Sequence, residues 1–311
     1  MELSAPFLVA YWPYLASILV GFLLTQIITR FYQPKKLSYT VDVDPLQDSD
    51  QTTIPPNDPA NFSVVGEREP DHMPYPWFGD RLSEKEMKKK SAEFFEKMDR
   101  RRTVRKISEE DIPLEVVENI IKTAGTSPSG AHTEPWTFVV VRDQSLKKEI
   151  RAIVEEEEYL NYAKRMGEKW VKDIEFTKTT WAKPYLNSAP YLILVFKQVY
   201  GLREDGSKLT HYYNEMSVCI SVGLLLAAIQ LMTLLWTEEE ICRSLKLSYE
   251  KNAGLVTVTS TPMNAGPRLR DLLGRKVNEK LILLLPVGYP ADDATVPCIK
   301  RKPLSDIMVL K

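Results

Sequence analysis

A long uncharged stretch at the N-terminus most constrains what this part of the chain can fold into. The 27 residues from Leu3 to Thr29 carry no formal charge. At about 1.5 Å per helical residue, about 20 of them cross the hydrocarbon core of a bilayer. The stretch has no polar face, unlike a buried soluble helix, and no basic side chain precedes it, unlike a cleaved signal peptide. We expect residues 1–36 to form a transmembrane anchor.

The charges that flank this stretch predict its orientation. Arg30, Lys35 and Lys36 follow it, whereas Glu2 is the one charged side chain before it. By the positive-inside rule, a single-pass protein with this charge distribution places the domain after the span in the cytosol. The rule does not distinguish the plasma membrane from an endomembrane.

Residues 37–80 differ from the rest of the chain in composition. They contain nine Asp or Glu, one Arg and seven prolines. Such a segment buries too little apolar area to offset the entropy lost on ordering. We expect an acidic, Pro-rich disordered tether, with an acidic docking segment as the alternative interpretation.

Residues 81–311 have the patterns of a folded α+β or α/β domain. Nearly continuous apolar runs predict strands covered on both faces by helices. The expected strands are 136–141, 191–196 and 281–285. The expected helices are 83–101, 113–124 and 214–230, with a charged helical region over 145–186. The first begins with a Ser-x-x-Glu capping pattern. The helix 214–230 is apolar nearly all round and is expected in the core or in a subunit interface.

Composition excludes several classes of function. Lys and Arg number 41 against 42 Asp and Glu, so there is no basic excess for holding nucleic acid. Three cysteines and three histidines are widely spaced, which argues against a disulfide scaffold and against a metal site. We therefore expect no nucleic-acid partner and no metal.

Three segments carry residue types suited to binding a ligand. Residues 101–105 (Arg-Arg-Thr-Val-Arg) end the first expected helix, and guanidinium groups one turn apart can converge on a phosphate. The loop 127–136 is rich in small residues, which let the backbone approach a flat ligand closely. Residues 257–262 supply hydroxyls at a strand end. None of the three is diagnostic alone.

Taken together, these segments resemble the nitroreductase/flavin reductase superfamily, and within it the iodotyrosine deiodinase family. The resemblance rests on Arg-Arg-Thr-Val-Arg at 101–105, Ser-Pro-Ser-Gly-Ala-His-Thr-Glu-Pro-Trp at 127–136, the helix from Asn214, and the Thr-Pro-Met-Asn-Ala-Gly-Pro-Arg segment after Ser260. It covers about residues 70–311. It implies a nitroreductase-like three-layer α+β fold with a central mixed sheet flanked by helices.

The resemblance also implies a cofactor site for FMN at the interface of a homodimer. The residues that match the family's FMN contacts are Arg101, Arg102, Thr103, Val104, Arg105, Ser129, Thr259, Ser260, Thr261 and Arg301. Of these, Thr261 is expected to act as the catalytic residue beside flavin N5.

The substrate site follows from the same resemblance. Glu158, Tyr162 and Lys183 match a lid that holds an amino-acid zwitterion, and the Ala131 backbone is expected near the phenolate. The implied reaction is FMN-dependent reductive deiodination of mono- and diiodotyrosine to tyrosine and iodide. NADPH is the expected electron donor, directly or through a separate reductase.

Residues 231–251 depart from the family pattern. They separate the apolar helix from the strand that leads to Thr259–Thr261, where family members pass directly from one to the other. A shift of about 1 Å at this junction costs about 100-fold in rate. The insertion has three possible interpretations: a catalytically weak membrane-tethered isoform, an error in the coding sequence, or a tolerated loop. A flavin reductase or nitroreductase for another substrate is a further alternative.

Overall fold

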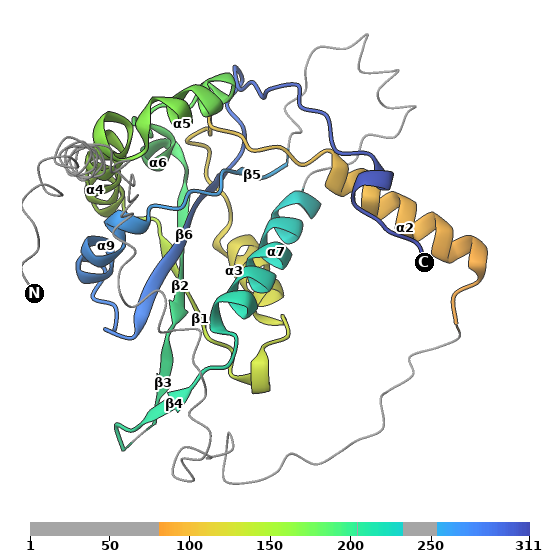
Figure 1. Ribbon diagram of the computed structural model, residues 1–311, viewed down its shortest axis with the longest axis horizontal. Helices are drawn as coiled ribbons and strands as arrows, with labels where there is room; N and C mark the ends of the chain where they lie inside the picture. Colours follow the sequence, from red (N-terminus) through yellow and green to blue (C-terminus); the bar gives the residue numbers. More distant parts are fainter. Residues whose placement is uncertain (1–80, 204, 233–253) are drawn as a thin grey trace, which may run out of the picture. The chain divides into compact units, whose positions relative to one another are not determined.

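The computed structural model describes residues 81–203, 205–232 and 254–311 (Figure 1). The expected anchor (1–36), the expected tether (37–80) and residues 233–251 of the insertion lie outside the described residues.

A four-stranded sheet in the order β1-β2-β6-β5 forms the centre of the domain. Its strands are β1 (Trp136–Val141), β2 (Tyr191–Gln198), β5 (Val256–Thr257) and β6 (Glu279–Gly288). The three expected strands are thus confirmed, and β5 is a short strand where one was expected to lead to Thr259–Thr261. All three strand pairs of this four-stranded sheet are antiparallel, so the described residues show the antiparallel part of the expected mixed sheet.

The central strand β2 is buried on both faces, as its apolar run predicts. Its side chains alternate between two clusters: Leu192 and Leu194 point into one, and Ile193 and Val195 into the other. The register with β6 shifts between Val195 and Phe196. An extra residue of this kind is a β-bulge, and because of it Leu281 and Leu283 pack against different clusters although they are two residues apart.

Helices cover both faces of the sheet (Figure 1). Helices α3 (Leu114–Gly125) and α7 (Asn214–Leu231) pack on one face, where Val117, Ile120, Val218 and Leu225 are buried. On the other face lie α4 (Gln144–Leu160), α6 (Tyr185–Ser188) and α9 (Gly266–Leu272). The expected layers of helix, sheet and helix are therefore present.

Helix α7 is the one helix among the described residues that is long and apolar enough to cross a membrane. Its buried side chains pack against α3 and the sheet, including Val218, Leu225 and Ile229. This is the packing of a core helix, as its sequence predicts. A second row of apolar side chains on α7 stays exposed: Met216 by 59%, Ile220 by 50% and Leu224 by 37%.

The region 145–186 is helical only in part, which corrects the expectation. After α4 come a π-helical turn η3 (Asn161–Arg165), α5 (Gly167–Ile174) and a 3-10 turn η4 (Glu175–Thr177). The chain then turns at Lys178, which is left-handed with φ 54°, and runs without helix to α6. Pro184 disfavours helical backbone at the residue before it, which accounts for part of this break.

The first helix, α2 (Glu84–Asp99), begins at the expected capping box. Ser83 Oγ accepts a hydrogen bond from the Glu86 amide, and Glu86 Oε2 accepts one from the Ser83 amide at 2.9 Å. The helix ends before the arginines, however. Residues 101–105 lie outside any helix or strand, so Arg101 and Arg105 are not one helical turn apart. The prediction that they end the helix is wrong.

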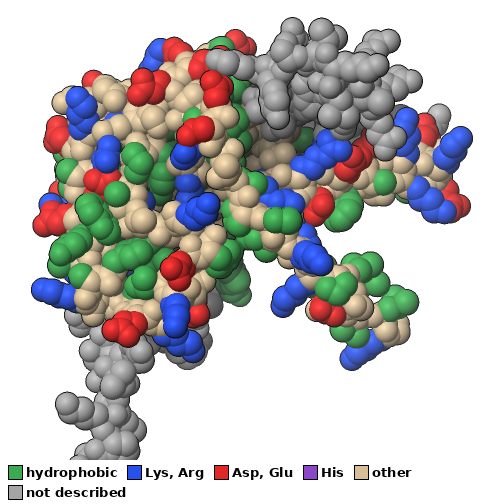
Figure 2. Space-filling model, turned by 90° about the horizontal axis from the view of Figure 1, so that it is seen from above, with side chains coloured by type: hydrophobic (Ala, Val, Ile, Leu, Met, Phe, Trp, Pro, Cys, Tyr) green, Lys and Arg blue, Asp and Glu red, His purple; other side chains and the backbone are tan. Residues whose placement is uncertain are grey.

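The remaining elements are short. They are the 3-10 turns η2 (Gly130–His132), η5 (Met263–Ala265) and η6 (Leu304–Asp306), and a hairpin of β3 (Tyr200–Leu202) and β4 (Lys208–Thr210). On the face shown in Figure 2, basic and acidic side chains are interspersed and form no extended patch of one sign.

Candidate active site

The arginine segment 101–105 crosses one end of the sheet. The Val104 amide donates to the Thr257 carbonyl at 3.2 Å, and the Ser108 amide donates to the Tyr289 carbonyl at 2.8 Å. Val104 itself is buried, so its side chain holds the segment against the domain. The polar side chains on either side of it are left partly accessible to a ligand.

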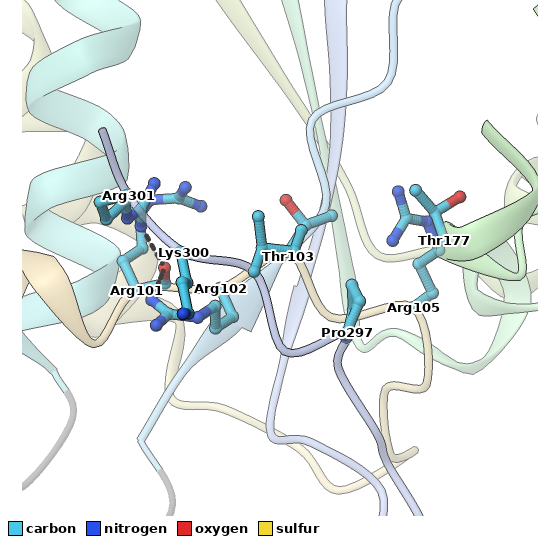
Figure 3. A pocket seen from close by; sticks show the side chains of 9 residues that line it. Arg101, Arg102, Thr103, Arg105, Thr177, Pro297, Lys300 and Arg301 are labelled. Atoms are coloured by element: carbon cyan, nitrogen blue, oxygen red, sulfur yellow. Dashed lines mark hydrogen bonds between the residues drawn. The ribbon is translucent and has the colours of Figure 1, made fainter. Parts of the chain in front are cut away.

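These side chains line a basic pocket of about 560 Å³ (Figure 3). The pocket joins the arginine segment to the C-terminal stretch of the chain. Its lining residues are Arg101, Arg102, Thr103, Arg105, Thr177, Pro297, Ile299, Lys300 and Arg301. In Figure 3, Arg101, Arg102, Lys300 and Arg301 gather at one side of Thr103, and Arg105 with Thr177 lies at the other.

The pocket concentrates positive charge. Arg301 Nη2 donates to the Arg101 carbonyl at 3.0 Å, although the two residues are 200 positions apart. Burial, and then the charges of Arg301 and Arg102, lower the pKa of Arg101. An anion in this pocket relieves such repulsion, and a phosphate offers oxygens that guanidinium groups can bind in pairs.

A second pocket, of about 640 Å³, shares Arg105 and Thr177 with the first. It brings together the α4 end, the 161–182 region and the segment after β5. Its lining residues are Arg105, Glu158, Tyr162, Trp170, Ile174, Thr177, Thr179, Lys183, Tyr185, Val258, Thr259, Ser260 and Thr261.

One wall of the second pocket carries a nearly buried ion pair. Lys183 Nζ lies 3.2 Å from Glu158 Oε2, and the side chains are 6% and 18% exposed. Lys183 Nζ also donates to the Thr180 carbonyl at 2.5 Å and lies 5.7 Å from the Tyr162 ring centroid. Burial, and then the charge of Glu158, raise the pKa of Tyr162, so its hydroxyl keeps its proton. The wall thus offers an anion, a cation and a neutral donor.

The segment after β5 forms another part of this pocket. Ser260 and Leu284 exchange main-chain hydrogen bonds of 3.0 and 2.9 Å, which tie this segment to β6. Thr259 and Thr261, on either side of Ser260, are exposed. Their hydroxyls are therefore available to a ligand.

Sequence comparisons agree with this arrangement. Residues 98–241 match the model of the Nitroreductase family. The chain is 64% identical to an iodotyrosine deiodinase from Nematostella vectensis over 276 residues, which are 89% of this chain and 96% of the relative. It is 55% identical to iodotyrosine deiodinase 1 from Homo sapiens over 239 residues, covering 77% of this chain and 75% of the human protein. The chain belongs to the iodotyrosine deiodinase family.

A solved member of the iodotyrosine deiodinase family shares the fold. It is a crystal structure of an oxidised iodotyrosine deiodinase bound to FMN and 3-iodo-L-tyrosine. The match has a TM-score of 0.52 and 28% identity, and it covers 68% of this chain and 96% of the other.

Two residues expected from the resemblance to the iodotyrosine deiodinase family do not join the two pockets. Ser129 and Ala131 lie just before β1, whose first residue, Trp136, pairs with Lys197 of β2, and Lys197 in turn pairs with Lys280 at the start of β6. The basic pocket lies near the other end of β6, where Val104 is bonded to Thr257, the partner of Val287. In the second pocket, Ser260 is paired with Leu284, in the middle of β6. At about 3.3 Å per residue, Lys280 is roughly 23 Å from Val287 and roughly 13 Å from Leu284 along β6.

Several lining residues escaped prediction. Trp170 lies on α5, Thr177 ends η4 and Thr179 follows it, and nothing in their spacing marks them. Lys300 could have been noticed, because it directly precedes Arg301. Among the described residues, no group of three or more His, Cys, Asp or Glu comes together as a metal site.

Proposed function

We propose that the protein is a membrane-anchored, homodimeric, FMN-dependent iodotyrosine deiodinase. The observation that carries the proposal is the adjacency of the two pockets. A cluster of arginines suited to a phosphate shares Arg105 and Thr177 with a cavity whose wall matches an amino-acid zwitterion. The family relationship and the FMN-bound and iodotyrosine-bound relative support it.

The residues of the basic pocket fit the phosphate of FMN. Arg101, Arg102 and Arg301 supply guanidinium groups whose mutual repulsion an anion relieves. The flavin ring would then extend past Arg105 toward Thr259, Ser260 and Thr261. With FMN bound there, the flavin supplies the electron transfer, and Thr261 offers a hydroxyl beside it.

The Glu158–Lys183 pair fits the ends of an amino acid. In the present structure each group neutralises the other at 3.2 Å. A bound zwitterion replaces this contact with two: Glu158 accepts from the ammonium group, and Lys183 and Tyr162 donate to the carboxylate. Because both charges remain paired, the exchange leaves no buried charge unsatisfied. Closing the 161–182 region over the substrate then excludes water from the site.

The reaction requires electrons from outside the protein. One C–I bond breaks, one C–H bond forms, and iodide leaves with the electron pair, which consumes two electrons and one proton. NADPH can supply both electrons as a hydride, directly or through a separate reductase. Mono- and diiodotyrosine each lose iodide by the same exchange.

A homodimer would bring Ser129 and Ala131 to the site. In one subunit neither residue lines either pocket, and Gly130 between them lies against the start of α7. The exposed apolar row Met216, Ile220 and Leu224 lies along the same helix. A twofold axis across this row pairs the start of one α7 with the end of the other, so that each loop reaches the partner's pocket.

Residues 1–36 would tether the enzyme to the bilayer as a single-pass anchor, with residues 37–80 as a spacer and the domain in the cytosol. Protease protection of a C-terminal epitope in sealed vesicles tests this orientation: a cytosolic domain is digested without detergent, and a lumenal one survives.

Ligand binding tests the proposed chemistry. The full chain, purified in mild detergent, is titrated with FMN and then with 3-iodo-L-tyrosine while flavin fluorescence is followed. We expect FMN to bind and iodotyrosine to quench it, and Glu158→Gln to weaken iodotyrosine binding without loss of FMN. A protein that binds FMN but not iodotyrosine supports a nitroreductase for another substrate instead.

A further inference from the structure

The position of Lys183 depends on how the chain returns to α4. The main chain leaves α4 after Leu160, makes the excursion 161–182, which we call the lid segment, and comes back at Lys183. Tyr162 lies on this segment and Glu158 lies on α4 before it. The distance between the charges of Glu158 and Lys183 therefore depends on the contacts that hold the two ends of the lid segment, at α4 and at Lys183, close together.

Glu155 holds that base. Its Oε1 accepts a hydrogen bond from the Lys183 amide at 2.6 Å, across 28 positions of sequence. The same oxygen accepts from Arg151 Nε at 2.8 Å, one turn earlier on α4. The Glu155 side chain is 18% exposed and that of Arg151 is 29% exposed. A bond from a main-chain amide to a carboxylate is charge-assisted, and little solvent competes for it here.

Glu155 does not itself line either pocket. It lies three residues before Glu158, so the two carboxylates share one face of α4. Glu158 contacts the ammonium group of Lys183, and Glu155 contacts its amide. Lys183 is thus fixed at both ends, and its main chain stays in place when a ligand draws the side chain away from Glu158.

We propose that Glu155 is a positioning residue that acts through Lys183 and so determines affinity for the carboxylate of the substrate. The inference rests on the proposed function of the Glu158–Lys183 site. A purely structural role for Glu155, as half of an i,i+4 helix pair with Arg151, stabilises α4 only slightly and has no preference for one ligand group.

Two ligands that differ in one group test the proposal. 3-Iodo-L-tyrosine carries the carboxylate, and 3-iodotyramine has the same phenol and ammonium group without it. Dissociation constants are measured by quenching of flavin fluorescence in the FMN-loaded full chain. Glu155→Ala removes the acceptor, Glu155→Gln keeps an amide oxygen for the Lys183 amide, and Glu149→Gln changes an exposed carboxylate on the same helix as a control.

We expect Glu155→Ala to raise the dissociation constant of iodotyrosine roughly tenfold, the effect of losing one charge-assisted hydrogen bond. Glu155→Gln should raise it by no more than about threefold, and Glu149→Gln should leave it unchanged. The constant for iodotyramine should change by less than about twofold in every variant. In a Lys183→Met background, Glu155→Ala should cost nothing further for iodotyrosine.

An equal loss of affinity for both ligands, or no loss for either, overturns the proposal. The same holds if Glu155→Gln is as impaired as Glu155→Ala. If Glu155→Ala does not fold, Glu155→Gln is compared with Glu149→Gln for both ligands and is also combined with Lys183→Met. A loss that is confined to iodotyrosine and absent in the Lys183→Met background supports the proposal, and any other pattern overturns it. Failure of the unmodified protein to bind FMN or iodotyrosine is a different result, and it contradicts the proposed function instead.

Discussion

Gly288 lets Ile107, two residues after the arginine segment, pack directly against the backbone of β6. Replacing Gly288 by alanine should displace that segment. Gly288 is the last residue of β6 and is buried. A Cβ built on it lies 2.4 Å from Ile107 Cγ2 and 2.8 Å from Pro190 Cδ. Ile107 is β-branched and buried, so its methyl group cannot rotate away freely. Relieving the overlap requires the main chain after Arg105 to move by about 1 Å.

Overpacking of this kind costs about 1–3 kcal/mol. For a domain of this size, the loss corresponds to a melting temperature lower by about 3–10 °C. The displaced segment carries Arg105, so FMN affinity should fall severalfold. Differential scanning calorimetry and flavin titration of the full chain measure the two effects.

Gly125, at the end of α3, provides the matched control. A Cβ there meets nothing within 4 Å. Ala is the better helix former, so Gly125→Ala should stabilise the domain by up to about 1 kcal/mol and leave FMN affinity unchanged. If Gly288→Ala melts at or above the temperature of the unmodified protein, the close packing of Ile107 against β6 is refuted.

Three further predictions concern the cofactor, the dimer and pH. Arg301→Ala should raise the dissociation constant of FMN at least tenfold and make FMN binding less sensitive to salt. FMN binding as sensitive to salt as that of the unmodified protein would contradict a contact between Arg301 and the phosphate. Ile220→Glu places a charge in the exposed apolar row of α7, so sedimentation velocity should show monomers that bind FMN poorly, whereas an intact dimer would place the interface elsewhere. Burial lowers the pKa of His211 below its ordinary value of 6.5, so the unfolded chain takes up a proton that the folded chain resists. Stability should therefore fall as pH drops below about 6.5, by up to about 1.4 kcal/mol per pH unit from this group, and His211→Gln should flatten that part of the urea midpoint curve.

Local pattern predicts the regular elements of this domain well. The strand Trp136–Val141 and the capping box at Ser83 have the predicted bounds, because the first is a continuous apolar run and the second depends on residues three apart. Pro184 indicates the end of the break at 178–184, but its start does not follow from the sequence, because nothing in the neighbours of Lys178 indicates a left-handed residue.

The site could be predicted only through resemblance, because its parts come from distant segments. No spacing rule connects Arg101 with Arg301, which meet 200 residues apart. Glu155 illustrates a second limit. It lies in a run of four glutamates, and sequence alone cannot tell which of them faces Lys183 and which faces solvent.

Iodide release from 3,5-diiodo-L-tyrosine tests the central claim most directly. The full chain, loaded with FMN in mild detergent, is reduced anaerobically with dithionite and mixed with the substrate, and iodide and tyrosine are quantified. We expect two iodides and one tyrosine from each diiodotyrosine consumed. No iodide should be released when FMN is removed, or by the Glu158→Gln variant at a low substrate concentration. A protein that binds FMN and diiodotyrosine yet releases no iodide would contradict the assignment of a deiodinase.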